Sequence, residues 1–310
     1  MQNNLAFVFP GQGSQTVGML KDFADNEIVQ TTFAEASSAL GYDLWQLVAE
    51  GPEEKLNSTN HTQPALLTAS VALWRLWQSE SDVEPAYLAG HSLGEYSALV
   101  CAGVLSLTDA VCLVEKRGEF MQAAVPEGVG AMAAVIGLDD QAIIDACAQA
   151  AESQVVSAVN FNSPGQVVIA GNAEAVAKAG ELCKDAGAKR VLPLPVSVPS
   201  HCALMEPAAE KLTEVFASVS FNHPSIPVVN NVDVAIENDI DKIKSALVRQ
   251  LYSPVRWTET VQYLSEAGVE NLLEVGPGKV LQGLMKRIDK SLTCVAVNDN
   301  ATLDKAKELV

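Results

Sequence analysis

The hydrophobic and polar positions of this chain predict short buried strands that alternate with helices. Short, mainly apolar runs are typical of strands buried on both faces, and they occupy residues 5–9, 86–89, 226–229, 271–275 and 293–297. Between them, apolar positions recur at helical spacing over residues 24–40, 44–49, 64–78, 95–103, 110–124, 203–217, 240–251, 258–267 and 279–288. Pro64 and the pair Thr108-Asp109 are expected at helix starts. The alternation indicates an α/β fold with a mostly parallel sheet covered on both faces.

The segment from about residue 130 to residue 195 has a hydrophobic pattern that differs from the rest of the chain. Its pattern predicts, in order, a strand at 131–136, a helix at 139–150, strands at 155–161 and 166–170, a helix at 174–186 and a strand at 190–194. This β-α-β-β-α-β order is the ferredoxin-like arrangement. We therefore predict a discontinuous α/β core of residues 1–127 and 197–310, and an inserted ferredoxin-like small subdomain of residues 128–196.

Composition and charge narrow the class of protein. With 310 residues, 48% hydrophobic and 19% charged, the chain is neither disordered nor fibrous. Its longest uncharged run, residues 153–173, is interrupted by Asn160, Asn162, Pro164 and Gly165, so it cannot cross a bilayer. No signal-peptide pattern precedes Lys21, the first basic residue. We expect a soluble, cytoplasmic, globular protein.

The net charge of −18 disfavours nucleic acid as a partner, since a phosphate backbone would be repelled. The charge is unevenly spread: residues 242–310 hold 10 Lys/Arg against 8 Asp/Glu, while residues 1–241 hold 10 against 30. Late basic residues such as Lys279, Lys286 and Arg287 would therefore dock an anionic partner, with Lys189 and Arg190 as a second candidate. The alternative is an ordinary solvated helix face.

The cysteines and histidines argue against a metal site. The six cysteines form no CxxC pair, and the four histidines form neither HxH nor HExxH. In a chain without a secretion signal, the cysteines are interpreted as free core thiols.

The sharpest chemical signal is the G-x-S-x-G pattern of Gly90-His91-Ser92-Leu93-Gly94. An apolar strand precedes it and a helical pattern follows, which is the setting that presents a nucleophilic serine at the end of a sheet. The flanking glycines permit a tight turn, and the helix amino terminus directs the Leu93 N–H at an oxyanion beside Ser92. The alternative is an ordinary Gly-rich turn.

A serine nucleophile needs a base, which is usually a histidine. His201 is the preferred candidate because an extended segment at residues 196–200 delivers it to a loop before a helix. His91 adjoins Ser92 but should point elsewhere, His61 is not excluded, and His223 is expected in a surface turn. No acidic residue stands out as a third member, so a backbone carbonyl is expected to orient the imidazole.

Two further features have both a chemical and an ordinary interpretation. The Gly11-Gln12-Gly13 loop lacks the rest of a dinucleotide fingerprint, and it can instead offer the Gln12 N–H as a second oxyanion donor. Arg117 lies on a predicted helix among other charges. It is either a solvated surface residue or a buried one that binds a carboxylate through two parallel hydrogen bonds.

Together these motifs resemble one family, the malonyl-CoA:acyl carrier protein transacylases of bacterial dissociated fatty acid synthesis. The family's motifs occur in family order as GQGSQ at 11–15, TQPAL at 62–66, GHSLGE at 90–95, Arg117, SVPSH at 197–201 and EVGPG at 274–278. The resemblance covers residues 5–297 and implies a hydrolase-like α/β core with a ferredoxin-like insertion.

The resemblance also implies roles for single residues. Ser92 would be the acylated nucleophile, His201 its base, and the Gln12 and Leu93 amides the oxyanion donors. Arg117 would bind the malonyl carboxylate, Gln63 would line the pocket, and Gln250 would lend its main-chain carbonyl to His201. The substrates would be malonyl-CoA and acyl carrier protein, with no cofactor and no metal. A monomer is expected, although no residue pattern decides the oligomeric state.

Two other functions use the same residues. An esterase or thioesterase would share the serine turn and differ only in passing the acyl group to water. A non-catalytic binding or scaffold subunit would keep the fold, and its Ser92 would not be acylated by malonyl-CoA.

Overall fold

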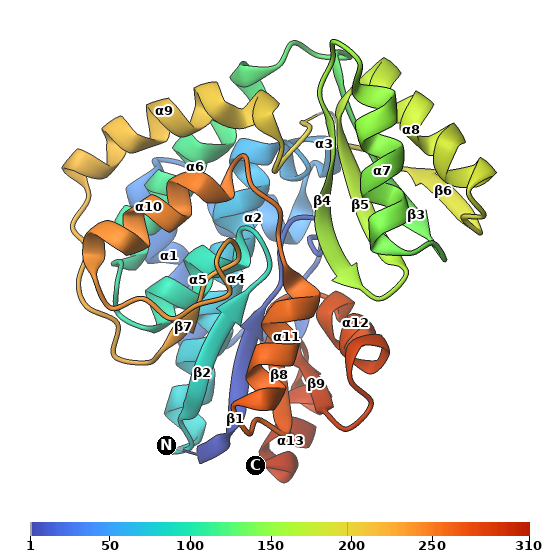
Figure 1. Ribbon diagram of the computed structural model, residues 1–310. Helices are drawn as coiled ribbons and strands as arrows, with labels where there is room; N and C mark the ends of the chain where they lie inside the picture. Colours follow the sequence, from blue (N-terminus) through green and yellow to red (C-terminus); the bar gives the residue numbers. More distant parts are fainter. Residues whose placement is uncertain (1, 197) are drawn as a thin grey trace.

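The computed structural model describes residues 2–196 and 198–310 and contains two sheets (Figure 1). The larger has five strands in the order β7-β2-β1-β8-β9, and all adjacent strands are parallel. They are β1 (Gln2–Phe9), β2 (Pro85–Gly90), β7 (Val228–Val229), β8 (Asn271–Val275) and β9 (Thr293–Val297). The predicted mostly parallel sheet is therefore confirmed.

Strand β1 shows how this sheet is buried on both faces. Because side chains alternate along a strand, Leu5, Phe7 and Phe9 enter one apolar cluster while Ala6 and Val8 enter another. Helix α4 (Thr59–Glu80) packs on the first face, where its Trp74 and Trp77 rings meet Phe7 edge-on. On the second face lie α11 (Trp257–Glu266), which Figure 1 shows in front of β8, and α12 (Val280–Ile288).

The remaining helices surround this core. They are α1 (Glu27–Leu40), α2 (Leu44–Glu50), α3 (Glu53–Leu56), α5 (Gly94–Cys101), α6 (Leu107–Ala124), α9 (Glu206–Val215), α10 (Ile240–Gln250) and α13 (Asn300–Leu309), with 3-10 turns at Lys21–Phe23, Ala203–Met205 and Phe216–Ser218. Within the described residues, no helix has both the length and the hydropathy needed to cross a membrane.

The second sheet is the predicted ferredoxin-like unit. Its antiparallel strands run in the order β4-β5-β3-β6, and helices α7 and α8 pack on one of its faces (Figure 1). The elements are β3 (Gly130–Ile136), α7 (Asp140–Ala151), β4 (Val156–Ser163), β5 (Gln166–Asn172), α8 (Ala173–Asp185) and β6 (Arg190–Pro193). Strand β4 also touches the core, since the Val255 N–H donates to the Val159 oxygen at 2.8 Å.

Three helix starts were predicted wrongly. Helix α1 begins at Glu27, because the Asn26 side chain caps it by accepting the Ile28 and Val29 N–H groups. Helix α4 begins at Thr59, so Pro64 lies inside it, because burial of the preceding turn outweighs the missing proline N–H. Helix α6 begins at Leu107, where the Ser106 hydroxyl caps the helix by accepting the Asp109 N–H at 3.0 Å. The division at residues 127/128 and 196/197 stays a prediction, and its second boundary falls at Ser197, which is outside the described residues.

Candidate active site

The turn between β2 and α5 presents Ser92 in a left-handed backbone conformation, with φ of 53°. A Cβ atom on Gly90 would lie 1.9 Å from the carbonyl carbon of Gly94, and one on Gly94 would lie 2.1 Å from the Phe9 oxygen. The predicted strand–turn–helix setting and the need for both glycines are therefore confirmed. A left-handed residue other than glycine costs about 1–3 kcal/mol, so its surroundings must hold it in place.

Ser92 and His201 meet although they are 109 positions apart in the chain. The Ser92 hydroxyl lies 2.8 Å from His201 Nε2. On the other side of the ring, Nδ1 lies 2.7 Å from the main-chain oxygen of Gln250. A carbonyl can only accept, so Nδ1 carries the proton and Nε2 has a free lone pair. His201 too has a left-handed backbone, with φ of 66°, and its N–H donates to the Leu251 oxygen at 2.9 Å.

The other three histidines have different partners. His91 Nε2 lies 2.8 Å from Asn162 Oδ1, so its side chain does point away from Ser92. His61 Nδ1 lies 3.2 Å from the side-chain oxygen of the neighbouring Asn60. His223 is exposed, as expected for a surface turn. Among the described residues, His201 is the imidazole that contacts Ser92.

Burial, and after it the positive charge of Arg117, lowers the pKa of His201 from 6.5 to about 3, while the hydrogen bond to Gln250 acts in the opposite direction. At neutral pH the imidazole is therefore uncharged. This protonation state leaves Nε2 free to accept a proton from Ser92.

Two backbone amides near Ser92 have no acceptor in the described part of the chain. Neither the Gln12 N–H nor the Leu93 N–H donates to another described residue, and both residues line the cavity next to Ser92. Leu93 directly precedes α5, where helix N–H groups carry partial positive charge. The pair is available for an oxyanion formed at Ser92.

Arg117 is a buried residue, with 1% of its surface exposed, so the solvated alternative is wrong. Its Nη1 donates to Gln63 Oε1 at 2.8 Å and its Nη2 donates to Gln250 Oε1 at 3.0 Å. Its Nε has no partner among the described residues. The guanidinium, which lines the same cavity as Ser92, therefore has N–H groups left for an anionic ligand.

The cavity holds about 110 Å³ and is lined by residues of both the core and the small sheet. Met132 from β3 and Asn160 from β4 line it beside Ser92, His201 and Arg117. Gln63, which was expected in this lining, is not part of it. Its side chain is fully buried in α4, and its Oε1 accepts from Arg117 Nη1, so Gln63 contacts the residue that lines the cavity.

A model of the family described as "Acyl transferase domain" matches residues 6–303. The chain belongs to this family. Within it, the chain is 67% identical to the malonyl CoA-acyl carrier protein transacylase of Escherichia coli, over 98% of this chain and 99% of that protein. The Bacillus subtilis enzyme of the same name is 46% identical, over 98% and 96% of the two chains. The chain is thus a member of the malonyl CoA-acyl carrier protein transacylases.

Solved structures agree with this assignment. An acyl carrier protein S-malonyltransferase from Vibrio cholerae has a TM-score of 0.96 and 66% identity, covering 97% of this chain and 99% of that one. A malonyl-transacylase in complex with a type II PKS acyl-carrier protein has a TM-score of 0.98 and 62% identity, covering 99% of this chain and 100% of that one. The fold of this acyl transferase is therefore the hydrolase-like core with a small subdomain.

No role was predicted for two buried polar residues of this transferase, Glu95 and Asn231. Glu95 Oε2 accepts from Gln250 Nε2 at 2.7 Å and from the Asn231 N–H at 3.0 Å. Burial raises the pKa of Glu95 to about 7, against the effect of both hydrogen bonds and of Arg117. Glu95 directly follows the G-x-S-x-G turn and was a visible candidate. Asn231 lies in no motif, so no local pattern could have indicated it.

Proposed function

We propose that this transferase moves a malonyl group from coenzyme A, through an acyl-enzyme on Ser92, to the phosphopantetheine thiol of acyl carrier protein. The observation that supports it best is one cavity lined by Ser92, His201 and a buried arginine with free N–H groups. The first two residues supply acyl transfer chemistry, and Arg117 can bind an acyl group that ends in a carboxylate.

In the first half-reaction Ser92 Oγ attacks the thioester carbonyl while His201 Nε2 takes the hydroxyl proton. The Gln250 oxygen holds Nδ1 and stabilises the imidazolium that forms. The carbonyl oxygen becomes an oxyanion between the Gln12 and Leu93 amides. The carbon–sulfur bond then breaks, and coenzyme A leaves as the thiol with the proton from His201.

Arg117 has a second effect on this step. Its charge lowers the pKa of His201, so a malonyl carboxylate paired with Arg117 offsets that charge. A bound malonyl group thereby makes His201 a stronger base, whereas an uncharged acyl group leaves it weak. Arg117 thus favours malonyl both by binding it and by tuning the base.

In the second half-reaction the thiol of the carrier protein gives its proton to His201 and attacks the malonyl ester of Ser92. The same oxyanion donors act, and Ser92 recovers its proton when the ester bond breaks. Arg117 fixes the acyl group relative to the incoming thiol, which favours transfer over attack by water.

Coenzyme A and the carrier protein are both anionic partners in this proposal. Lys286 and Arg287 are exposed at the end of α12, and Lys279 is exposed just before it. None of the three forms an ion pair with the described residues. Arg287 donates to the Gln166 side chain, which is uncharged. Basic side chains without an acidic partner provide, on a protein of net charge −18, a local surface for phosphate groups and acidic residues. This surface is the proposed docking site.

The proposal includes a cytoplasmic monomer that acts without a bound cofactor. In the described residues there is no group of three or more histidine, cysteine or acidic side chains that would hold a metal ion. Light scattering at micromolar concentration tests the oligomeric state, and a dimer would contradict it.

Intact-mass measurement after mixing with malonyl-CoA tests the function. We expect one malonyl adduct on the wild-type protein, absent from Ser92→Ala, and its transfer to added carrier protein. Release of free malonate at the same rate with and without carrier protein would favour the hydrolase alternative. Absence of any adduct would favour the non-catalytic subunit.

A further inference from the structure

Asn231 is fully buried two residues after β7, in contact with the turn that carries Ser92. Its Oδ1 accepts the Ser92 N–H at 2.7 Å, and its Nδ2 donates to the Gly90 carbonyl oxygen at 2.6 Å. One side-chain amide thus spans the left-handed turn on both sides of His91.

These two hydrogen bonds continue the parallel ladder between β2 and β7. Alternate residues of a parallel strand bond to both neighbours of their partner residue. The Leu88 N–H donates to the Pro227 oxygen at 2.8 Å, and Ala89 is paired with Val229. In the same register Asn231 is opposite His91, whose neighbours are Gly90 and Ser92. The Asn231 side chain therefore takes the place of the next backbone rung.

The main chain of Asn231 takes no part in the β2–β7 ladder, because its N–H is bound by the Glu95 carboxylate instead. The Asn231 N–H donates to Glu95 Oε2 at 3.0 Å, and the same oxygen accepts from Gln250 Nε2 at 2.7 Å. Gln250 in turn holds His201 through its main-chain oxygen. A single carboxylate oxygen thus joins the segment that holds Ser92 to the segment that holds His201.

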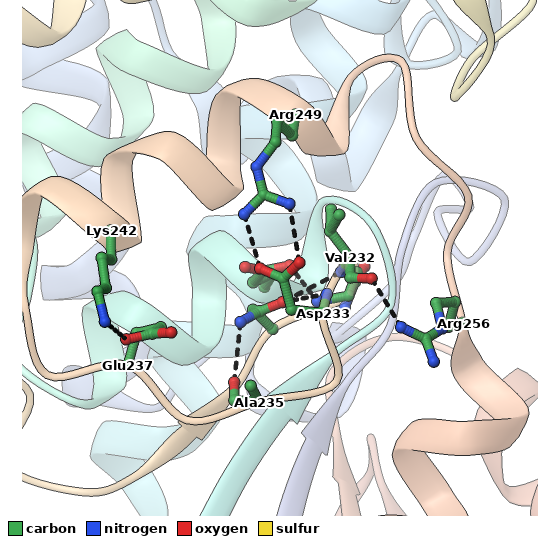
Figure 2. A network of polar contacts seen from close by, with 10 residues as sticks. Val232, Asp233, Ala235, Glu237, Lys242, Arg249 and Arg256 are labelled. Carbon is green, nitrogen blue, oxygen red and sulfur yellow. Dashed lines mark hydrogen bonds and ion pairs between the residues drawn. The ribbon is translucent and has the colours of Figure 1, made fainter.

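The loop after Asn231 also contacts α10, the helix that ends at Gln250 (Figure 2). Arg249, which precedes Gln250 in α10, donates to both carboxylate oxygens of Asp233 at 2.8 and 2.6 Å. Arg256 donates to the Val232 oxygen at 3.1 Å. The beginning of the loop between β7 and α10 is therefore held by two arginines, one near the end of α10 and one directly before α11.

We propose that Asn231 is a positioning residue for acyl transfer, whose carboxamide keeps Ser92 in its left-handed conformation and aimed at His201. The inference rests on the proposed function and adds a residue to it. Asn231 lies behind the turn and holds the nucleophile through the backbone. Losing its two hydrogen bonds should therefore slow both half-reactions equally and leave the KM for malonyl-CoA unchanged.

The first test compares Asn231→Leu with the wild type by rapid-quench intact mass. Two reagents are used: malonyl-CoA, and an uncharged fluorophosphonate that reacts with activated serines. We expect Asn231→Leu to be acylated about 10²-fold more slowly by both, the size of effect that a small misplacement of reacting groups produces. The matched control is Asn222→Leu, which removes an exposed asparagine that bonds to the Gly103 oxygen at 3.5 Å. If the wild type reacts with the fluorophosphonate but not with malonyl-CoA, the proposed function fails while this comparison still stands.

The second test uses Asn231→Asp, which keeps the shape of the side chain. Only a protonated aspartic acid can both donate to the Gly90 oxygen and accept from Ser92. The ionisable groups near this position are Glu95, Asp233 and Arg249, together with His91 in the turn, His201 against Ser92, and Arg256, whose N–H donates to the Asn231 oxygen. Burial favours the neutral acid. We expect the fluorophosphonate rate of Asn231→Asp, relative to wild type, to rise at least tenfold from pH 8 to pH 5. Wild-type rates for a folded Asn231→Leu, or an Asn231→Asp profile parallel to wild type, would overturn the proposal.

Discussion

Glu95 and Glu274 are two buried carboxylates that sit beside glycine-containing turns between a core strand and a helix. Burial raises the pKa of each to about 7, and each accepts two N–H groups. Both acceptor bonds of Glu274 go to Leu281 and Gln282 in the first turn of α12. The bonds of Glu95 instead reach two segments distant in sequence, at residues 231 and 250.

Burial and pKa therefore do not separate a structural carboxylate from one that supports an active site. Glu274 caps a helix amino terminus, which stabilises the helix locally. Glu95 connects the supports of Ser92 and His201, so its loss affects chemistry. The hydrogen-bond partners of a buried carboxylate therefore decide its role. The contrast between the active site around Glu95 and the region around Glu274 leads to five predictions.

The largest effect is expected at Ser92 itself. Ser92→Ala should lower transfer by about 10⁴-fold or more, because the nucleophile is lost. His201→Ala should cost a comparable factor, and the double variant little more, since the two act as a unit. Intact mass after malonyl-CoA is the measurement, and an adduct on Ser92→Ala would place the nucleophile elsewhere.

Arg117, like Glu95, is a buried charged residue that bonds to Gln250 and supports the active site. Arg117→Ala should lower kcat/KM for malonyl-CoA by an amount equivalent to about 2–5 kcal/mol of transition-state free energy, because the substrate carboxylate loses its buried partner. Acylation by acetyl-CoA should not fall in parallel, since the charge that weakens His201 is also removed. A variant that keeps its preference for malonyl over acetyl would show that Arg117 does not bind the carboxylate. Arg117→Lys, which keeps a charge without the planar fork, should be intermediate.

The matched pair Glu95→Ala and Glu274→Ala tests the two carboxylates directly. Glu95→Ala should lower kcat by about 10²-fold, because the Asn231 and Gln250 donors lose their shared acceptor and the site loosens. Glu274→Ala should leave kcat unchanged and lower the free energy of unfolding by about 1–3 kcal/mol. Steady-state kinetics and urea unfolding of both variants are the measurements. Equal kinetic effects would remove the distinction.

Helix α12, which Glu274 caps, is the proposed docking element for the carrier protein. Reversing Lys286 and Arg287 to glutamate should raise the KM for carrier protein by about tenfold at low salt, with a smaller change at high salt. Lys242→Glu, on α10, is the control for a single charge reversal. An unchanged KM at low salt would move the docking surface away from α12.

The last prediction concerns the stability of the fold against pH and has no expected effect on catalysis. A folded-state pKa of about 7 for Glu95 and Glu274, above the usual 4.5, means that the folded protein binds protons more tightly between these pH values. Both residues should therefore make the free energy of unfolding fall as pH rises from about 4.5 to 7. Glu274→Gln should make this fall shallower by up to about 1.4 kcal/mol per pH unit. Urea unfolding across that range is the measurement, with exposed Glu308→Gln as the charge control; an unchanged slope would contradict the shifted pKa.

Sequence alone determined what depends on neighbouring residues. The apolar runs of β1, β8 and β9 and the glycines around Ser92 express short-range rules of burial and backbone conformation. Helix α13 was not predicted, although its signal is local too: the Asp299–Thr302 capping box marks its start.

Only the tertiary structure decided which histidine faces Ser92, that Arg117 is buried, and that Asn231 completes the ladder beside the nucleophile. Each of these depends on segments more than a hundred residues apart that cross at the carboxyl ends of parallel strands. The pattern along a single strand or helix carries no information about which distant segment will cross it. The packing of the whole sheet supplies that information.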